Sequence, residues 1–492
     1  MLLSFLENLP ATPHKVRIAN QRPPGGGWMR WLVIATIANL THLALGQNMS
    51  SDSSTNPQTQ PVLQKSKAGM DGANLASEER AIISQTIAKH DGDPALPLDS
   101  ENSASPSAEQ AIQENAPTPR RLHYSVSLSV RSVFDSNIDL TNTGEQSDFY
   151  TAIEPRLTIG FGTPEENFVA LSYYPSAFIF AEHSENNALQ HEFLLQGQYR
   201  FPRLTLTASQ EVQLLDGTDL GSVLGSGAGY TTSSSGHVNL DVAGRTRVDV
   251  YNTHLDGNYS LTGKLFLTGG IAYSLTDYTN DALIDSSVIS ANAYLNYIYS
   301  PKLSIGLGLN GGYDVVSSSG QDQIYEQLNL RATYGLTGKV SASATVGVEF
   351  RQFSGADGGN TVSPVLDASL SYQPFDGTNI SLTLSTHTYN SATLGGENYL
   401  NTQIILGVQQ RLFQRFLLGL NTGYETSNYS SAGTANSTGR DDNYFFFEPS
   451  LDFSITRFWT AGIYYLYRQS DSSLSIFSFD DTQIGARSTL TF

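Results

Sequence analysis

Few residues in the chain have the types and spacing that catalysis requires. The absence of cysteine excludes a thiolate metal site and a cysteine nucleophile. A Walker-type Gly-Lys-Ser/Thr loop and a His-Glu-x-x-His sequence are also absent. His254 and His387 fall on predicted inner faces of strands, where either could pair with a serine in a lipase-like site. Because serine is abundant, chance pairing explains this equally well, and we expect no enzymatic activity.

Acidic residues gather in predicted loops, at Asp277, Asp281 and Asp285 and again at Asp441 and Asp442. Such groups could bind calcium or bridge lipopolysaccharide through divalent cations. Their spacing matches no recognised calcium loop, so we expect solvated charge there, with no metal and no cofactor. The formal charge of −19 also disfavours nucleic acid as a partner, because phosphate binding needs a basic face.

The elements that position these residues are long strands. Leu or Ile occupies the odd positions from 303 to 309, while Ser and Gly occupy the even positions between them. Similar alternation runs through residues 340–351 and 400–412. A period of two sustained over about ten residues indicates a strand, and this length matches the ~9–11 residues that cross a membrane's hydrocarbon layer. With only 15% charged residues, the composition suits strands that have one apolar and one neutral-polar face.

Short turns and longer polar loops alternate along the chain. Turns are predicted near 163–167, 202–203, 263–264, 301–302, 338–339, 376–379, 414–415 and 457–458. Loops are predicted near 135–147, 181–188, 216–236, 277–286, 317–323, 354–363, 391–398, 430–442 and 471–479. We therefore expect an all-β, antiparallel up-and-down transmembrane β-barrel of about eighteen strands, with sixteen as the alternative. Residues 237–250 are the least regular part, because Gly244-Arg245-Thr246-Arg247 interrupts the alternation.

The residues before the barrel carry two further predictions. Residues 31–46 form an apolar run that is short for a transmembrane helix, so residues 1–46 are interpreted as a signal peptide. An uncleaved anchor is the alternative, and Met29 is a second candidate for the initiator. Residues 47–119 lack Phe, Tyr and Trp and are predicted to be a disordered periplasmic linker. The barrel then occupies residues 120–492, with both of its ends in the periplasm.

The alternation also predicts which side chains face the lumen and which face lipid. The charged residues predicted to face the lumen are six bases and six acids, namely Arg131, Asp314, Arg331, Glu349, Arg351, Asp367, Arg411, Glu425, Glu448, Asp452, Arg468 and Arg487. Aromatic clusters near strand ends, such as Phe149-Tyr150 and Tyr464-Tyr465, are predicted to form the interface girdles. Ile484, Leu490 and Phe492 share one face of the last strand and resemble the barrel-assembly signal of outer-membrane proteins.

Residues 122–492 resemble the putative β-barrel porin 2 family. The resemblance lies in Ser132-Val133-Phe134-Asp135-Ser136-Asn137-Ile138, in Asp277-Tyr278-Thr279-Asn280-Asp281 and in the repeated Ser-Pro-Lys and Thr-Gly-Lys turns. Members are similar to proteins found alongside exopolysaccharide production and export systems. The resemblance implies a role in moving solute or polysaccharide across the outer membrane of a Gram-negative bacterium.

Two functions of different classes follow as expectations. The first is an outer-membrane channel for passive passage of solutes or export of polysaccharide, narrowed where the 216–236 loop folds inward. The alternative is a non-conducting barrel that anchors surface loops for adhesion or polymer attachment. The expected partners are membrane lipid, lipopolysaccharide, the barrel-assembly machinery and polysaccharide. The sequence leaves the oligomeric state open.

Overall fold

The computed structural model describes residues 122–163, 167–218, 238–242, 244–317, 321–337, 339–354, 359–431 and 439–492. The signal peptide over 1–46, the second initiator Met29 and the linker over 47–119 all lie outside these residues. The described chain forms strands with two short 3₁₀ helices, Ser184–Asn186 and Ser475–Phe477. No helix within the described ranges is long and apolar enough to cross a membrane.

Eighteen strands account for nearly all of the described chain. They are 13 to 16 residues long, well above the ~5–6 residues usual in soluble sheets. In chain order they are β1 Leu122–Asp135, β2 Asp148–Gly162, β3 Phe168–Phe180, β4 Ala188–Arg200, β5 Leu204–Gly217, β6 Thr246–Ser260, β7 Leu265–Tyr278, β8 Ser286–Ser300, β9 Leu303–Val316, β10 Gln323–Thr337, β11 Val340–Phe353, β12 Asn360–Tyr372, β13 Thr378–Asn390, β14 Glu397–Leu412, β15 Phe416–Ser431, β16 Asp441–Thr456, β17 Trp459–Ser472 and β18 Phe479–Thr491.

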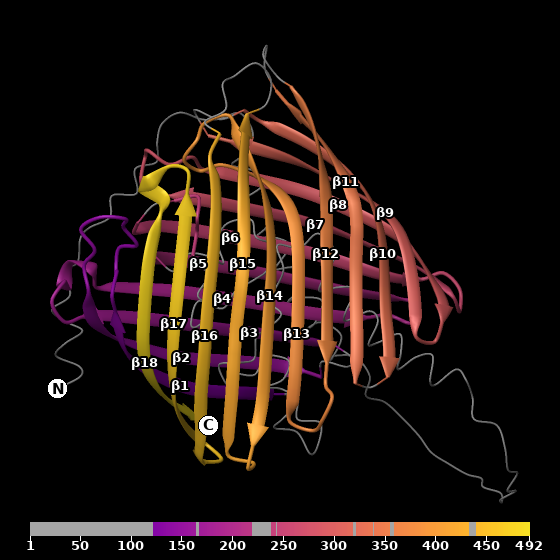
Figure 1. The fold of residues 1–492 in the computed structure, drawn as a ribbon. Coiled ribbons are helices and arrows are strands. Elements are labelled where there is room, and N and C mark those ends of the chain that lie inside the picture. The colour runs from indigo at the N-terminus through magenta and orange to yellow at the C-terminus, as the bar shows by residue number, and fades with distance from the viewer. Residues whose placement is uncertain are drawn as a thin grey trace, which may run out of the picture. The chain divides into compact units, whose positions relative to one another are not determined.

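The strands form one closed antiparallel barrel (Figure 1). Each strand pairs with its neighbours in sequence, and β1 pairs with β18 to close the sheet. Closure leaves no sheet edge, which matters in a bilayer because unpaired backbone groups cannot bond to water there. The predicted all-β barrel of eighteen strands is confirmed, and sixteen is excluded.

The two ends of the barrel differ in their connections. Eight connections of five residues or fewer lie at one end, which we call the turn end, together with Leu122 and Thr491. Nine connections of six residues or more lie at the other end, the loop end. At one turn Gly162 has a φ of +102°, and a Cβ there would lie 2.0 Å from the Asn167 carbonyl oxygen, so only glycine fits.

One strand begins later than the alternation suggests. Residues 238–242, 244 and 245 are not part of a strand, and β6 starts at Thr246. The irregular stretch around Gly244 therefore belongs to the β5–β6 connection, which spans residues 218–245. The predicted loop over 216–236 is too short by nine residues.

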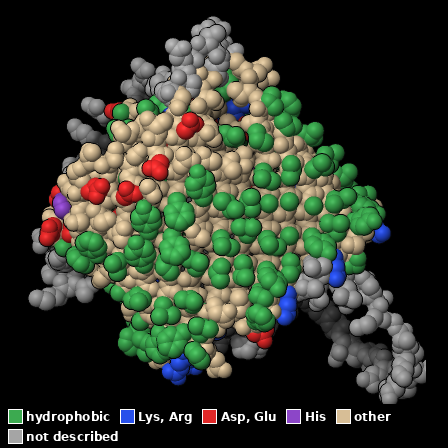
Figure 2. Space-filling view, in the orientation of Figure 1, with side chains coloured by type: hydrophobic (Ala, Val, Ile, Leu, Met, Phe, Trp, Pro, Cys, Tyr) green, Lys and Arg blue, Asp and Glu red, His purple; other side chains and the backbone are tan. Residues whose placement is uncertain are grey.

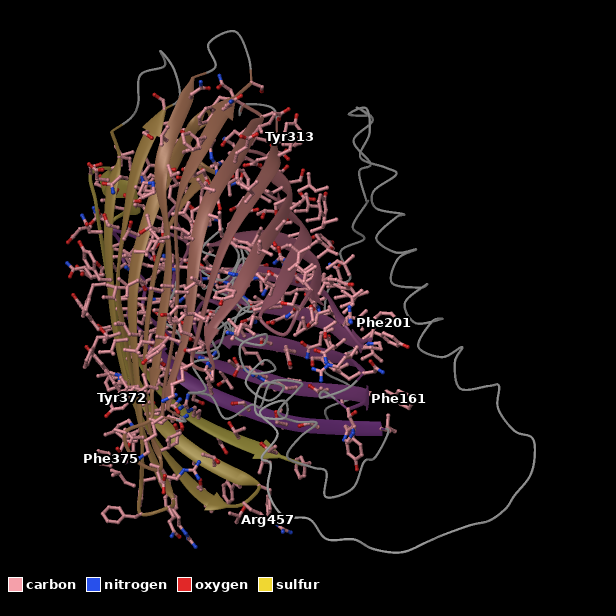
Figure 3. The ribbon with its side chains drawn as sticks, turned by 90° about the vertical axis from the view of Figure 1, so that its right-hand side faces the viewer. Phe161, Phe201, Tyr313, Tyr372, Phe375 and Arg457 are labelled. Carbon is pink, nitrogen blue, oxygen red and sulfur yellow. The ribbon has the colours of Figure 1, made fainter. Side chains whose placement is uncertain are left out.

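Apolar side chains cover the outside of the barrel. Leu309, Leu330 and Val362 are 63%, 63% and 65% exposed, and Figure 2 shows such residues as a broad band around the visible face. In Figure 3, Tyr313 lies toward the loop end, while Phe161 and Phe375 lie toward the turn end, all pointing away from the bore. An apolar band with aromatics at both rims is typical of an outer-membrane barrel.

The adjacent aromatic pairs do not lie wholly in these girdles. Phe149 is 62% exposed, but Tyr150 is 5% exposed. Tyr465 likewise points outward at 37% exposure, while Tyr464 is buried. Adjacent residues in a strand face opposite sides, so half of each pair must point inward. The prediction that both members of each pair serve the girdle was wrong.

Candidate channel constriction

The inner wall carries charged side chains from strands spread around the barrel. Of the twelve predicted lumen residues, the ten buried ones are Arg131, Asp314, Arg331, Glu349, Arg351, Glu425, Glu448, Asp452, Arg468 and Arg487. Asp367 is partly buried and accepts a 2.7 Å contact from His387 Nε2. Arg411 is exposed, because it lies next to the last residue of β14 at the turn end.

Most of these charges are neutralised in pairs along the wall. Arg351 Nε lies 2.7 Å from Glu349 Oε1 on the same strand, and Arg487 Nη2 lies 2.5 Å from Asp452 Oδ2 two strands away. Arg331 instead donates to Asn296 Oδ1 and stacks over a tyrosine ring, 4.1 Å from the centroid. The wall therefore carries mainly paired charges and neutral polar groups, rather than an excess of positive or negative charge.

Sequence reasoning missed two acids of this wall. Glu154 on β2 receives Arg131 Nη2 at 2.7 Å, and Asp481 on β18 receives Arg468 Nε at 2.6 Å. Both acids are buried. Glu154 lies four residues after the buried Tyr150 on β2, so the two side chains share a face. The period of two therefore predicts that Glu154 faces inward.

A second group of side chains lies at the loop end, around the β5–β6 connection. Residues 238–242, 244 and 245, which we call the inward segment, follow the undescribed part of this connection. The Asp241 amide donates to Asn239 Oδ1 at 3.0 Å, a local turn that asparagine commonly makes. Gly244, with a φ of +73°, then redirects the chain toward β6.

Asp241 anchors the inward segment. One carboxylate oxygen accepts hydrogen bonds from Ser391 Oγ at 2.8 Å, Thr393 Oγ1 at 3.1 Å and the Tyr429 hydroxyl at 3.0 Å. The other accepts the Ala392 amide at 2.5 Å. Asp241 is 2% exposed, and desolvation raises its pKa above the ordinary value of 3.8. The four hydrogen-bond donors offset the free-energy cost of burying an ionised carboxylate.

Arg440 completes the anchor from the β15–β16 connection. Its guanidinium is fully buried, donating to Asp442 at 2.6 Å and to the Leu240 carbonyl oxygen at 2.5 Å, with a longer contact of 3.5 Å to Asp241. The guanidinium also stacks on Tyr429, 4.3 Å from its ring centroid. Removing one member of so buried a set leaves its partner's charge uncompensated.

Apolar residues of the inward segment pack against several strands. Val238 and Leu240 join a buried cluster with Tyr150 on β2 and Phe446 on β16. Val242 joins a second cluster that includes Leu215, Val248, Val250, Tyr278 and Ala392. Both polar and apolar contacts therefore hold the segment in place.

The contacts of the inward segment join opposite walls of the barrel. The segment connects β5 to β6, whereas its hydrogen-bond partners lie on β15 and on the β13–β14 and β15–β16 connections. In a ring of eighteen strands, β6 and β15 are nine places apart in either direction. A second bridge is the Ile284 amide, which donates to the Ala392 carbonyl oxygen at 2.8 Å. The segment thus crosses the bore at the loop end.

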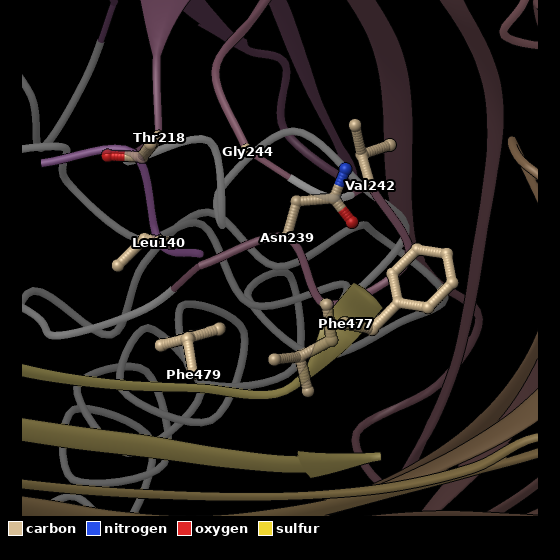
Figure 4. Close-up of a pocket in the computed structure, with 8 residues that line it drawn as sticks. Leu140, Thr218, Asn239, Val242, Gly244, Phe477 and Phe479 are labelled. Atoms are coloured by element: carbon tan, nitrogen blue, oxygen red, sulfur yellow. The ribbon is translucent and has the colours of Figure 1, made fainter. Parts of the chain in front are cut away.

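One small pocket lies beside the crossing. A pocket of only about 10 Å³ lies between the inward segment and the neighbouring loops (Figure 4), and its lining includes Leu140, Asn239 and Phe477. That is about the smallest volume that holds one water molecule. The pocket is a gap in packing rather than a ligand site.

The structure alters the expectation for the loop acids. Asp442 is fully buried against Arg440, so it is not solvated charge as predicted, while its neighbour Asp441 is exposed. Asp285 Oδ1 accepts the Tyr278 amide at 2.9 Å. Within the described residues, no group of three or more His, Asp or Glu side chains is placed to hold a metal ion.

Residues 327–492 match the family model described as "Putative beta-barrel porin 2", the family that the sequence resembles. No curated protein matches the chain. Among solved structures the chain is similar to Pseudomonas aeruginosa OpdK with vanillate, at 12% identity and a TM-score of 0.39, covering 75% of this chain and 99% of that one. It is also similar to the unliganded ferric citrate transporter FecA, at 9% identity and a TM-score of 0.40, covering 75% and 78%. The chain forms a porin-like β-barrel of the outer-membrane type.

Proposed function

We propose that the chain is an outer-membrane channel for passive passage of solutes or export of polysaccharide, constricted at the loop end by the inward segment. The observation that carries this proposal is the buried link from Asp241 to the opposite wall. Barrels of ~16–18 strands are wide enough to leave an aqueous channel. A segment anchored across such a bore sets the size of what passes.

The chemistry of the wall supports a neutral, hydroxyl-rich solute. On β8 to β10 the inner face carries Tyr294, Asn296, Asn310, Gln327 and Asn329, all buried. Asn310 donates to Gln327 at 3.1 Å, and Asn329 donates to the Tyr294 hydroxyl at 3.0 Å. Amides and tyrosines supply both donors and acceptors without net charge, which is what sugar hydroxyls need.

The turn end faces the periplasm in this proposal, and the loop end faces outside. Short periplasmic turns and longer external loops are the usual asymmetry of outer-membrane barrels. Polysaccharide would then enter at the turn end and leave past the inward segment. Lipid, lipopolysaccharide and the barrel-assembly machinery are the further partners that this placement requires.

One observation favours the second function, a non-conducting barrel that anchors its loops. Apolar residues fill part of the loop end, where Ile138 and Leu140 of the β1–β2 connection join Val238 and Leu240 in one buried cluster. A loop end closed in this way would present a continuous outer surface for adhesion or polymer attachment.

Conductance across a planar bilayer separates the two functions. The purified chain should give stepwise conductances. Asp241→Asn should increase their size or open time, because the amide nitrogen that replaces one carboxylate oxygen cannot accept the hydrogen bonds donated there. Asp441→Asn is the matched control, since that acid is exposed at the start of β16, and it should leave conductance unchanged. A folded barrel that stays silent in all three forms would reject the channel and support the anchor.

A further inference from the structure

β12 and β13 are hydrogen-bonded to each other along only about half of their length. Their ladder contains seven residue pairs and ends at Leu366 and Thr386. By contrast, β12 forms thirteen pairs with β11, and β13 forms thirteen with β14. The two strands separate toward the loop end (Figure 1). We call this part, residues 360–365 of β12 and residues 387–390 of β13, the fork.

Pro364 explains where the ladder stops. The Gln373 amide donates to the Lys339 carbonyl oxygen on the β11 side, so the backbone groups of Pro364 point the other way, toward β13. Continued past its last pair, the register would place Pro364 opposite Thr388. Proline has no N–H and cannot donate to the Thr388 carbonyl oxygen. Arg351 Nη2 donates to that oxygen instead, at 3.1 Å.

Proline alone does not keep two strands of this barrel apart. The ladder between β16 and β17 skips Glu448 and Pro449, but residue pairs form on both sides of them. At the fork, the described residues of β12 and β13 do not pair again beyond Pro364. A second cause must therefore hold the two strands apart.

That cause is the position of the β13–β14 hairpin, whose loop end is drawn to the lumen side of the wall. Asn398 of β14 exchanges two hydrogen bonds with Gln323 of β10, at 2.9 and 2.8 Å, although these strands are four places apart in the ring. The Arg351 side chain that reaches Thr388 is buried on the inner wall. The connection after β13 is held by the inward segment. β13 therefore passes inside the wall, and the edge of β12 has no described partner strand there.

The edge of β12 at the fork lies beside an apolar outer surface. Val362 is 65% exposed, and Phe350, which is opposite it on β11, is also exposed. Unpaired backbone groups are costly in hydrocarbon, and at membrane depth they are tolerated where they line water or are covered by protein. The fork therefore offers backbone donors and acceptors to a polar group immediately beside lipid.

The inner side of the fork is polar. His387 Nε2 lies 2.7 Å from Asp367 Oδ1, and both side chains remain partly exposed. Thr388 Oγ1 donates to Ser363 Oγ at 2.8 Å. The alternate residues of β13 are apolar before the fork and polar from the last pair onward, namely Ile380, Leu382, Leu384, Thr386, Thr388 and Asn390. The fork thus joins an apolar flank on β12 to a polar flank on β13.

We propose that the fork is a lateral binding site for a membrane amphiphile that has an acyl chain and a hydroxyl-bearing head. The chain lies along the outer face of β12, where Val362 and Phe350 give it apolar contacts. The head lies at His387 and Asp367, whose side chains supply a donor and acceptors for hydroxyl groups. This site goes beyond passage along the bore, because it connects the lumen with the surrounding bilayer.

Disulfide formation tests whether the strands separate. The chain has no native cysteine, so Val362→Cys/Asn390→Cys places one pair in the fork, at positions that a continued register would set opposite each other. Leu370→Cys/Leu382→Cys is the matched control, because these residues are opposite each other in the ladder. Opposite residues have Cβ atoms ~4.5–5.5 Å apart. The control pair should therefore cross-link on mild oxidation, and the fork pair should not.

Photolabelling tests the ligand. The probe is dodecyl maltoside with a diazirine in its alkyl chain, added to the full chain in nanodiscs. Label should concentrate on residues 360–366 of β12 and should be displaced by excess unlabelled dodecyl maltoside. Maltose has the same head without a chain, and dodecyl phosphocholine has the same chain without hydroxyl groups. Each supplies only half of the contacts, so each should displace much less label.

Variants on the two flanks identify the contacts. His387→Gln should reduce the displaceable label by removing the imidazole from the polar flank, and Val362→Asn should reduce it by removing an apolar contact. The matched controls are Thr378→Val at the turn end of β13 and Val346→Asn on the outer face of β11. Both controls should leave the label unchanged. Heat-modifiable migration in gels shows that each variant is folded.

Three outcomes would overturn the proposal. Cross-linking of the fork pair as readily as the control pair would mean that the ladder continues. Label spread evenly around the apolar belt would mean ordinary lipid contact. Displacement by maltose or by dodecyl phosphocholine as effective as that by dodecyl maltoside would mean that the site recognises only a head or only a chain. None of these readouts depends on conductance, so their failure is distinct from failure of the proposed channel.

Discussion

Arg131 on β1 donates through Nη1 to the hydroxyl of Tyr464 on β17, at 3.2 Å, across the intervening strand β18. The tyrosine ring lies over Gly485 of β18, where a Cβ would approach its Cε1 atom to 2.2 Å. The register also places Arg131 directly opposite Arg487, and like charges so placed repel. Both guanidinium groups instead bind carboxylates, Arg131 with Glu154 and Arg487 with Asp452.

Gly485→Ala should weaken the seam where β1 and β18 close the barrel. The added methyl group would displace the Tyr464 ring and its bond to Arg131, and overpacking of this kind costs ~1–3 kcal/mol. The measurement is the urea midpoint for loss of the heat-modifiable form. Gly335→Ala is the control, because no atom lies within 4 Å of a Cβ built there. Equal midpoints for the two variants would contradict this account of the seam.

Acid should favour the docked inward segment. Burial raises the pKa of Asp241 above 3.8, so the docked carboxyl holds its proton more tightly than a released one. Docking therefore gains free energy as pH falls through the raised pKa, and the gain levels off below the ordinary value. Single-channel recordings should show smaller or shorter openings at acidic pH. Asp241→Asn should remove this dependence; a variant that keeps it would place the titrating group elsewhere.

Arg351→Ala should shift ion selectivity toward cations. The change leaves Glu349, now 2.7 Å from Arg351 Nε, as an uncompensated lumen carboxylate. Reversal potentials in a salt gradient measure the shift. Arg411→Ala should act in the same direction but more weakly, because that side chain is exposed at the mouth. The double variant Glu349→Gln/Arg351→Ala should return the reversal potential toward its original value, and failure to do so would show that the pair does not line the pore.

Phe492→Ala should reduce the amount of barrel that reaches the membrane folded. The Phe492 side chain is 68% exposed and lies on the outward face with Ile484, while its backbone amide donates to Val126 at 2.8 Å. Alanine keeps the backbone bond, so the loss would report recognition of the side chain. The heat-modifiable fraction in isolated membranes measures the effect, and Thr491→Ala is the control. Equal fractions would exclude Phe492 from an assembly signal.

The strands could be predicted because their signal is local. Residues 303–315 show which side chains share a face without reference to any other strand, and turns repeat at nearly constant spacing. The number of strands follows from counting those turns. Residues 237–250 are the least regular part of the pattern, and the structure gives the reason: Asn239, Asp241 and Gly244 serve a local turn and an anchor.

The anchor itself could not be predicted, because its partners are distant in the chain. Asp241 and Arg440 are separated by 199 residues, and both lie in connections that have no periodicity. A charged residue in a polar loop is normally solvated, so Asp442 carried no sign of its burial. Only the closed ring of strands brings these connections to opposite sides of one mouth.

The crossing segment also has a mechanical consequence. A ring of eighteen strands can flatten into an ellipse by small changes in the angle between neighbouring strands, with every ladder hydrogen bond kept. The hydrogen bonds from Ser391 and Tyr429 to Asp241 connect two opposite walls and fix the distance between them. Lateral pressure from the bilayer then acts on a barrel whose cross-section is held round in part by the Asp241 carboxylate.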